Sequence, residues 1–216
     1  MRAAFKNPGQ IQREKERLDA MWRFEREARE SGFRIIAGID EAGRGPLAGP
    51  VVSAAVILPE QYRLFGLDDS KKLSERQREN CYERITQDAV AWGVGLCDHE
   101  EIDRINILNA TIKSMETAIS ELEARPDCLL IDAVRLKNVD IEQMPIVKGD
   151  ALSLSIAAAS VLAKVTRDRL MLAYDSQYPG YGFAKHKGYG TKEHIAKIKE
   201  LGLCPIHRAS FCVSFI

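Results

Sequence analysis

Four acidic residues are placed where they could form a metal-binding site. They follow or precede apolar segments of the chain: Asp40, Glu41, Asp132 and Asp150. In open α/β sheets, sites gather beyond the carboxyl ends of strands, so adjacent strands would bring Asp40 and Asp132 together. Grouped carboxylates repel one another unless cations neutralise them. Hard oxygen ligands favour Mg²⁺ or Mn²⁺ over zinc, and two such ions can promote hydrolysis of a phosphodiester.

Each acid also has an ordinary structural interpretation. Asp150 precedes a long helical pattern and alone would be an N-cap. Asp40 and Glu41 precede a glycine and alone would form a solvated turn. The residues by themselves therefore leave both interpretations open.

The elements that must position these acids follow from the hydrophobic pattern. Apolar, β-branched runs predict strands at 33–39, 51–58, 90–97, 128–131 and 144–147. Helical spacing or capping predicts helices at 10–31, 74–89, 99–124, 153–174 and 191–201, with a loop at 177–190. This order favours an α/β fold, a five-stranded mixed sheet flanked by helices. We expect an N-terminal helical extension at 1–32 and one domain with a C-terminal helical part at 33–216.

Composition excludes several classes of protein. The chain has 216 residues, of which 45% are hydrophobic and 29% charged, so it is neither disordered nor a membrane protein. The charged N-terminus is no secretory signal. Five scattered cysteines without a C-x-x-C motif favour a reducing cytoplasm over a disulfide scaffold or a zinc site.

The formal net charge is zero, but the charge is unevenly distributed along the chain. Residues 35–159 hold 13 Lys/Arg against 21 Asp/Glu, whereas residues 160–216 hold nine against four. An acidic centre beside basic ends suits a protein that holds metal ions on carboxylates and grips a polyanion around them. Ordinary solvated surface would give the same counts.

Six short motifs around these acids resemble those of bacterial ribonuclease HII. They are GIDEAGRGPLAGP (38–50), DSKKLS (69–74), NILNAT (106–111), KGD running into SIAAAS (148–160), KHKGYG (185–190) and HRASF (207–211). The resemblance implies a ribonuclease H-like fold. It also implies hydrolysis of the RNA strand of RNA/DNA hybrids, and incision 5′ of single ribonucleotides in duplex DNA that leaves 3′-hydroxyl and 5′-phosphate ends.

The resemblance also assigns roles to residues. Asp40, Glu41, Asp132 and Asp150 match the family's metal-binding acids, which would hold two Mg²⁺ or Mn²⁺ ions. The loop Gly43-Arg44-Gly45 matches the family's ribose sensor, consistent with the need to touch a 2′-hydroxyl to tell RNA from DNA. Tyr189 matches a tyrosine that stacks on the downstream sugar. The expected phosphate contacts are Lys71, Lys185 and Lys187.

Other features stay outside this assignment. His186, His194 and His207 lack metal-ligand spacing and are interpreted as structural or surface residues. Ala133 stands after Asp132 where many relatives have glycine. We expect a monomeric cytoplasmic enzyme without membrane contact. The alternatives are a metal-dependent nuclease of the same fold that cuts plain or branched DNA, and a non-catalytic nucleic-acid-binding module.

Overall fold

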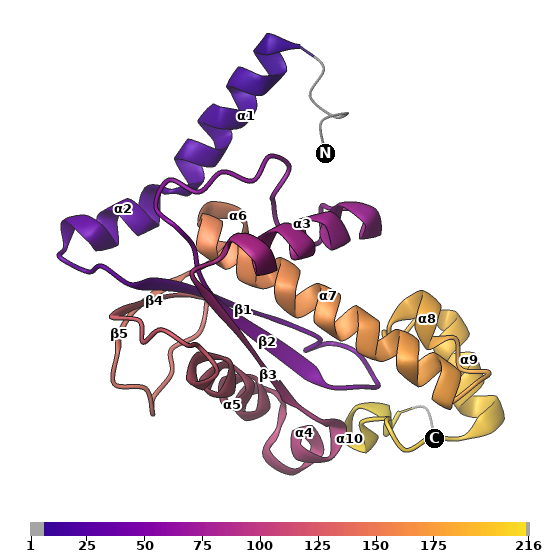
Figure 1. Ribbon diagram of the computed structural model, residues 1–216. Helices are drawn as coiled ribbons and strands as arrows, with labels where there is room; N and C mark the ends of the chain where they lie inside the picture. The colour runs from indigo at the N-terminus through magenta and orange to yellow at the C-terminus, as the bar shows by residue number, and fades with distance from the viewer. Residues whose placement is uncertain (1–6, 215–216) are drawn as a thin grey trace.

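The computed structural model describes residues 7–214, and in this part of the chain one mixed sheet lies between helices (Figure 1). The strand order is β3-β2-β1-β4-β5. Strand β2 runs antiparallel to both β1 and β3, whereas β4 runs parallel to both β1 and β5. The strands are β1 (Ile36–Ala42), β2 (Val51–Ile57), β3 (Ala91–Cys97), β4 (Cys128–Asp132) and β5 (Glu142–Ile146). The predicted five-stranded mixed sheet is confirmed.

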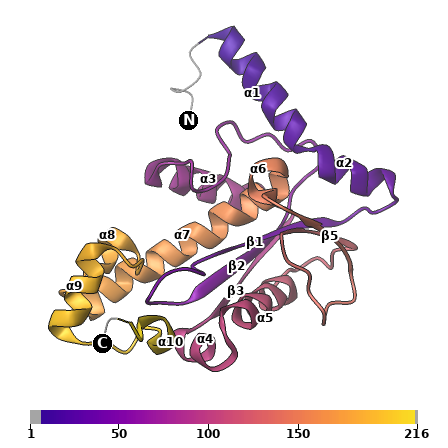
Figure 2. The same ribbon diagram turned by 180° about the vertical axis from the view of Figure 1, so that it is seen from behind.

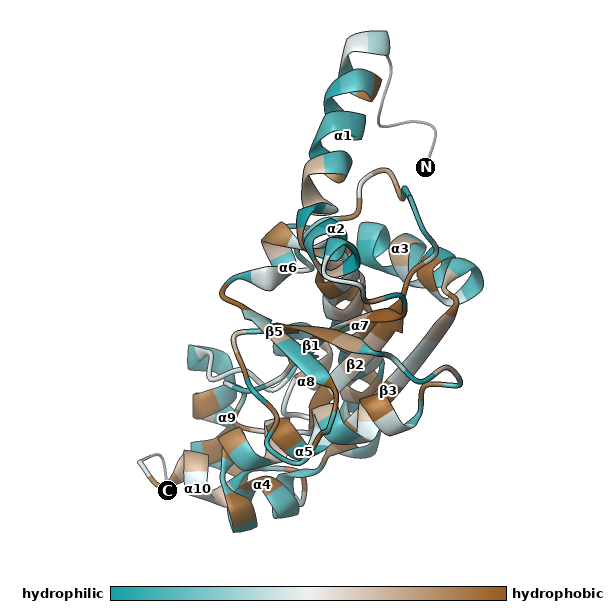
Figure 3. Ribbon diagram, turned by 90° about the vertical axis from the view of Figure 1, so that its left-hand side faces the viewer, coloured by the Kyte–Doolittle hydropathy of each residue, from teal (hydrophilic) through white to brown (hydrophobic). Residues whose placement is uncertain are grey.

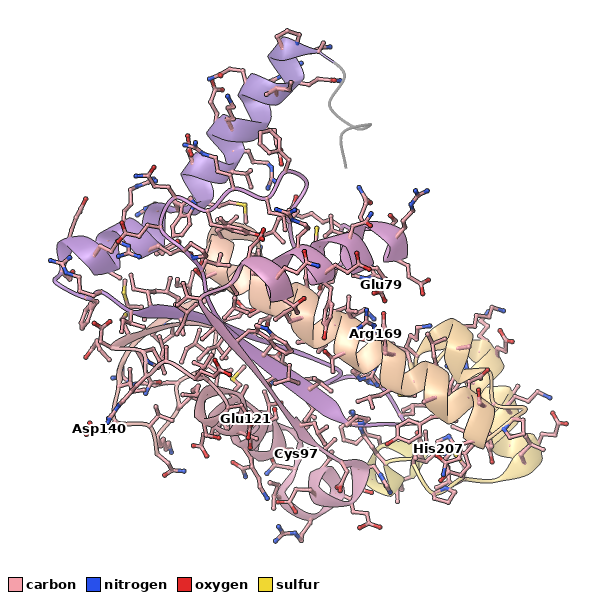
Figure 4. All side chains as sticks on the ribbon, viewed as in Figure 1. Glu79, Cys97, Glu121, Asp140, Arg169 and His207 are labelled. Atoms are coloured by element: carbon pink, nitrogen blue, oxygen red, sulfur yellow. The ribbon has the colours of Figure 1, made fainter. Side chains whose placement is uncertain are left out.

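Helices cover both faces of this sheet (Figures 1 and 2). The long helix α7 packs on β1 and β2, with α3 outside it, and α5 packs on the opposite face. Figure 4 shows Glu79 of α3 beside Arg169 of α7, and the two form an ion pair. The helices are α1 (Pro8–Met21), α2 (Arg23–Glu30), α3 (Glu75–Asp88), α4 (His99–Ile105), α5 (Ile107–Ser120), α6 (Gly149–Leu152), α7 (Leu154–Gln177), α8 (Phe183–His186), α9 (Lys192–Leu201) and α10 (Ala209–Cys212).

Strand β1 differs from its predicted bounds at both ends. It begins at Ile36 because the carboxylate of Asp127 accepts the backbone N–H groups of Arg34 and Ile35 and holds them outside the ladder. It continues through Asp40 to Ala42 because β2 keeps pairing with it there. The first two candidate acids therefore lie inside a strand, where their backbone is fixed.

Two predicted helices are each divided in the structure. The helix predicted at 99–124 breaks at Asn106, whose φ of 70° ends α4 and whose side chain caps α5 through the Asn109 N–H. The helix predicted at 10–31 breaks at Trp22, whose buried indole donates to the carbonyl of Tyr62. In both cases the hydrophobic periodicity predicts the apolar face of the helix. It does not predict the side-chain hydrogen bonds at the positions where each helix is divided.

The N-terminal helices pack on the core through the C-terminal half of α1 and through α2. Leu18, Met21 and Trp22 belong to the apolar cluster under α7, whereas Figure 3 shows α1 as largely hydrophilic. Glu25 is buried in α2 and accepts hydrogen bonds from the Ser153 hydroxyl and the Ser155 N–H at the start of α7. The N-terminal extension thus holds the first turn of α7, the helix that follows Asp150. No helix within residues 7–214 is long and apolar enough to cross a membrane.

Candidate active site

Neighbouring strands bring the first three acids to one end of the sheet. The parallel pairing of β1 with β4 ends at Ile39 and Ile131, immediately before Asp40 and Asp132. Asp40 is only 3% exposed, and its Oδ1 accepts the N–H of Glu41 at 2.8 Å. The sheet thus places two carboxylates at matching positions on adjacent strands.

A hydrogen bond from the next segment brings in the fourth acid. Oδ1 of Asp132 accepts the N–H of Gly149 at 2.7 Å, which ties the end of β4 to the first turn of α6. Asp150 is the next residue and is buried there. The left-handed backbone of Lys148, with φ of 60°, turns the chain into this position. Asp150 is therefore fixed by its neighbour Gly149.

Three of the acids, Asp40, Glu41 and Asp132, have raised pKa values. Burial first, and the charges of Glu41 and Asp132 next, raise the pKa of Asp40 well above its usual value. Burial and the charge of Asp132 also raise the pKa of Glu41, against the opposing attraction of Arg44. Burial, with the charge of Asp150, raises the pKa of Asp132, although the Gly149 bond opposes this. This pattern indicates a cluster that gains from a bound cation.

Lys71 lies against this cluster and supplies a positive charge. Its ammonium group bonds Oδ2 of Asp150 at 3.1 Å. Burial lowers its pKa, but the bond to Asp150 and the attraction of Asp40 outweigh burial and leave the pKa raised. Its charge also acts on Glu41 and Asp132. The structure therefore places Lys71 among all four acids.

The donor atoms of the cluster fit hard divalent cations. All four side chains offer carboxylate oxygens, and Oε2 of Glu41 is buried without a hydrogen-bond partner. An orphaned buried oxygen in an acidic cluster is what a metal ion would satisfy. Among residues 7–214, however, no three His, Cys, Asp or Glu side chains are already arranged to hold a metal ion. Metal binding would require local adjustment of the carboxylates, including the pairing of Asp150 with Lys71.

The glycine-rich loop after β1 lies directly beside the acids. Nη1 of Arg44 is 3.6 Å from Oε1 of Glu41. A Cβ on Gly43, whose φ is 98°, would come within 2.1 Å of the Arg167 side chain, so only glycine fits there. A Cβ on Gly45 would lie 3.9 Å from the ring of Tyr189, which is 44% exposed. The structure thus brings the loop and Tyr189 together.

Two buried arginines hold this loop, Arg167 and Arg208, and the sequence motifs assign no role to either. Arg167 donates to the carbonyls of Ala48, Pro50 and Lys187, and Arg208 donates to three further carbonyls of residues 43–49. A signal for both is present in the sequence, because Arg167 lies in a predicted buried helix and Arg208 lies in the HRASF motif. Charged residues are rarely buried unless they are paired, so a buried arginine implies hydrogen-bond partners nearby.

The remaining predicted residues have partners away from the acids. Lys185 pairs with Glu193, and the ammonium of Lys187 donates to the carbonyl of Ala184. The three histidines are buried and hydrogen-bonded, with Nε2 of His194 and His207 3.1 Å apart. His207 lies beside the C-terminal helices (Figure 4). The structural interpretation of the histidines agrees with these contacts.

The backbone at Ala133 supports a prediction about stability. Ala133 has φ of 53°, a left-handed conformation that costs a non-glycine residue about 1–2 kcal/mol. Glycine would remove that strain but would lose about 0.5–1 kcal/mol to the greater freedom of the unfolded chain. We expect Ala133→Gly to stabilise the protein by about 0.5–1 kcal/mol in urea unfolding. A loss of stability would show that the alanine methyl group makes contacts that outweigh the strain.

Comparison with known proteins shows the family of this chain. The family model described as ribonuclease HII matches residues 37–214. Ribonuclease HII of Ruminiclostridium cellulolyticum is 60% identical over 94% of this chain and 80% of its own length. The crystal structure of ribonuclease H2 from Pyrococcus horikoshii superposes with a TM-score of 0.70 and 27% identity, covering 84% of this chain and 97% of that one. Bst-RNase HIII in complex with Mn²⁺ shares the fold, with a TM-score of 0.58, 19% identity, and coverage of 81% and 65%.

Proposed function

Since the chain belongs to the ribonuclease HII family, a family of nucleases acting on RNA/DNA hybrids, we propose a specific activity for it. The protein incises duplex DNA on the 5′ side of single embedded ribonucleotides and leaves 3′-hydroxyl and 5′-phosphate ends. The same site cuts the RNA strand of longer hybrids.

One arrangement carries this proposal, namely a glycine-rich loop directly beside the acidic cluster with the exposed Tyr189 next to that loop. A protein distinguishes RNA from DNA at one nucleotide by contacting the 2′-hydroxyl. At Gly45 the absence of a Cβ leaves room for a sugar to approach the backbone beside Tyr189, whereas at Gly43 it makes room for the buried Arg167 side chain. The ring of Tyr189 supplies a flat surface for the neighbouring sugar, and Arg44 can donate to a phosphate.

The four acids would hold the metal ions, with Asp40 as the central ligand because it lies between Glu41 and Asp132. When bound, Mg²⁺ or Mn²⁺ ions activate a water and stabilise the leaving 3′-oxygen. The 2′-hydroxyl serves recognition, so no 2′,3′-cyclic phosphate forms. Lys71 can leave Asp150 and contact a phosphate once cations neutralise the acids. Lys185 and Lys187 lie in the same segment as Tyr189. Exchange of their present partners for phosphates would increase the affinity for the duplex.

Incubation of a duplex carrying one ribonucleotide tests this function. In Mg²⁺ or Mn²⁺ we expect one cut 5′ of the ribonucleotide with the stated ends, and in EDTA a loss of cleavage of at least about 10³-fold, since the ions supply several kcal/mol of stabilisation. The matched all-DNA duplex is the control. Equal cleavage of that control would favour a plain DNA endonuclease. Binding of the duplex without cleavage would favour a non-catalytic binding module. A 2′,3′-cyclic phosphate product would contradict the metal-water mechanism.

A further inference from the structure

Arg208 is fully buried, and within residues 7–214 its guanidinium forms no ion pair. It donates instead to three backbone carbonyls of the glycine-rich loop: Gly43 at 2.6 Å, Arg44 at 3.0 Å and Gly49 at 2.9 Å. Its guanidinium also lies over the ring of Phe211. The whole hydrogen-bonding fork of this side chain is therefore directed at one loop.

Burying such a charge is costly, so the choice of arginine here requires a reason. Burial, and then the nearby charge of Arg167, lower the pKa of Arg208. An apolar side chain of similar volume would fill the same space without the desolvation cost. An apolar side chain could not donate hydrogen bonds to several carbonyls at fixed angles, whereas the planar guanidinium does so. The fork geometry is thus what distinguishes arginine from other residues at this position.

The direction of these bonds decides where the loop's own N–H groups point. In a trans peptide the C=O and N–H point in opposite directions, and the described chain contains no cis peptide bond. With the carbonyls of Gly43 and Arg44 turned inward to Arg208, the N–H groups of Arg44 and Gly45 point away from it. In the described structure neither of these two N–H groups has an acceptor. They are free to donate to a substrate.

We propose that Arg208 is a positioning residue for ribose recognition. It holds the carbonyls of Gly43 and Arg44 inward, so that the N–H groups of Arg44 and Gly45 face the sugar and phosphate of the ribonucleotide. Arg208 itself does not touch the substrate. This inference rests on the proposed function of the loop as the ribose sensor.

The segment that carries Arg208 is itself anchored from α4. The carboxylate of Asp103 accepts the Ala209 N–H at 2.7 Å, the Ser210 N–H at 3.2 Å and the Ser210 hydroxyl. The N–H of Arg208 donates to the carbonyl of Leu47 at 2.8 Å. Asp103 is half-buried, so its replacement loosens this anchor without opening the core. It offers a second and milder way to disturb the position of Arg208.

Three variants test the proposal by their kcat/KM on the single-ribonucleotide duplex and by their Kd for the matched all-DNA duplex. Arg208→Lys keeps the charge but loses the fork, and we expect kcat/KM to fall about 30-fold, mainly in kcat. Asp103→Ala should lose about threefold to fivefold. Neither should change the Kd for the all-DNA duplex more than about twofold, because the lysine contacts persist. Ile85→Ala, in the core far from the loop, is the stability control and should keep kcat/KM within about twofold at 25 °C.

Several outcomes would overturn the proposal. Arg208→Lys, folded by circular dichroism, could cleave at the wild-type rate, or Ile85→Ala could lose as much activity as Arg208→Lys. If Arg208→Lys does not fold, Asp103→Ala decides, and wild-type kinetics for it would refute the proposal. A wild-type protein that cuts an RNA/DNA hybrid but not the single ribonucleotide would refute the proposed incision at single ribonucleotides and leave the role of Arg208 open to test. Every nucleotide of the RNA strand carries a 2′-hydroxyl, so the same variants are then compared on the hybrid.

Discussion

Replacement of Asp40 by asparagine is expected to abolish cleavage while making the metal-free protein more stable. Asn keeps an oxygen that accepts the N–H of Glu41, so the local fold survives. It removes the charge that lies between Glu41 and Asp132, and with it the ligand expected to be central. We expect a loss in kcat of about 10³-fold or more, corresponding to several kcal/mol of transition-state stabilisation.

The gain in stability has a defined pH dependence. The pKa of Asp40 is raised in the folded protein, so ionisation of this group opposes folding once the pH exceeds its unfolded value near 3.8. Wild type therefore loses stability relative to Asp40→Asn as the pH rises through the folded pKa. In EDTA, the Tm of the variant should exceed that of wild type at pH 8, and the difference should shrink toward pH 4.

A measurement of duplex binding separates loss of catalysis from loss of substrate affinity in Asp40→Asn. Asp40→Asn should bind the ribonucleotide duplex within a few-fold of wild type, because the loop and the lysines are untouched. A variant that cleaves within tenfold of wild type would remove Asp40 from the catalytic machinery. A variant that is less stable than wild type at pH 8 in EDTA would contradict the repulsion among the acids.

The second large effect concerns folding, at Gly38 in β1. A Cβ at this position would lie 2.1 Å from the backbone carbon of Ser155 and 2.4 Å from the nitrogen of Ile156 in α7. Both obstacles are main-chain atoms of the central helix, which no rotamer change can move. We expect Gly38→Ala to lower the free energy of unfolding by more than about 4 kcal/mol, enough to deplete folded protein.

Gly45→Ala is the matched control for the same change of residue. Its Cβ would meet no atom closer than 3.9 Å, so it should fold with nearly wild-type stability in urea unfolding. Displacement of α7 would also carry the helix start away from Asp150, so Gly38→Ala should lose activity together with structure. A Gly38→Ala protein with a wild-type unfolding midpoint would contradict the close approach of β1 and α7.

The structure also shows what the sequence could not predict about the site. The sequence pattern singles out Asp40, Glu41 and Asp132 because they follow apolar segments, and Asp150 because it precedes a long helical one. The motif resemblance then favours metal binding over ordinary turns and caps. Lys71 was assigned to a phosphate, and only the structure places its ammonium against Asp150. The apolar period does not reveal the break at Asn106, because a single residue with positive φ leaves that period almost unchanged.

The alternation of apolar strands and helices by itself determined the mixed sheet, because burial of apolar faces depends on patterns that can be read along the chain. Tertiary structure alone decided which carbonyls Arg167 and Arg208 bind. Their partners lie more than a hundred residues away, apart from Lys187, and no local pattern encodes such a distance. Hydrogen-bond satisfaction of a buried charge is settled only when the whole chain has packed around it.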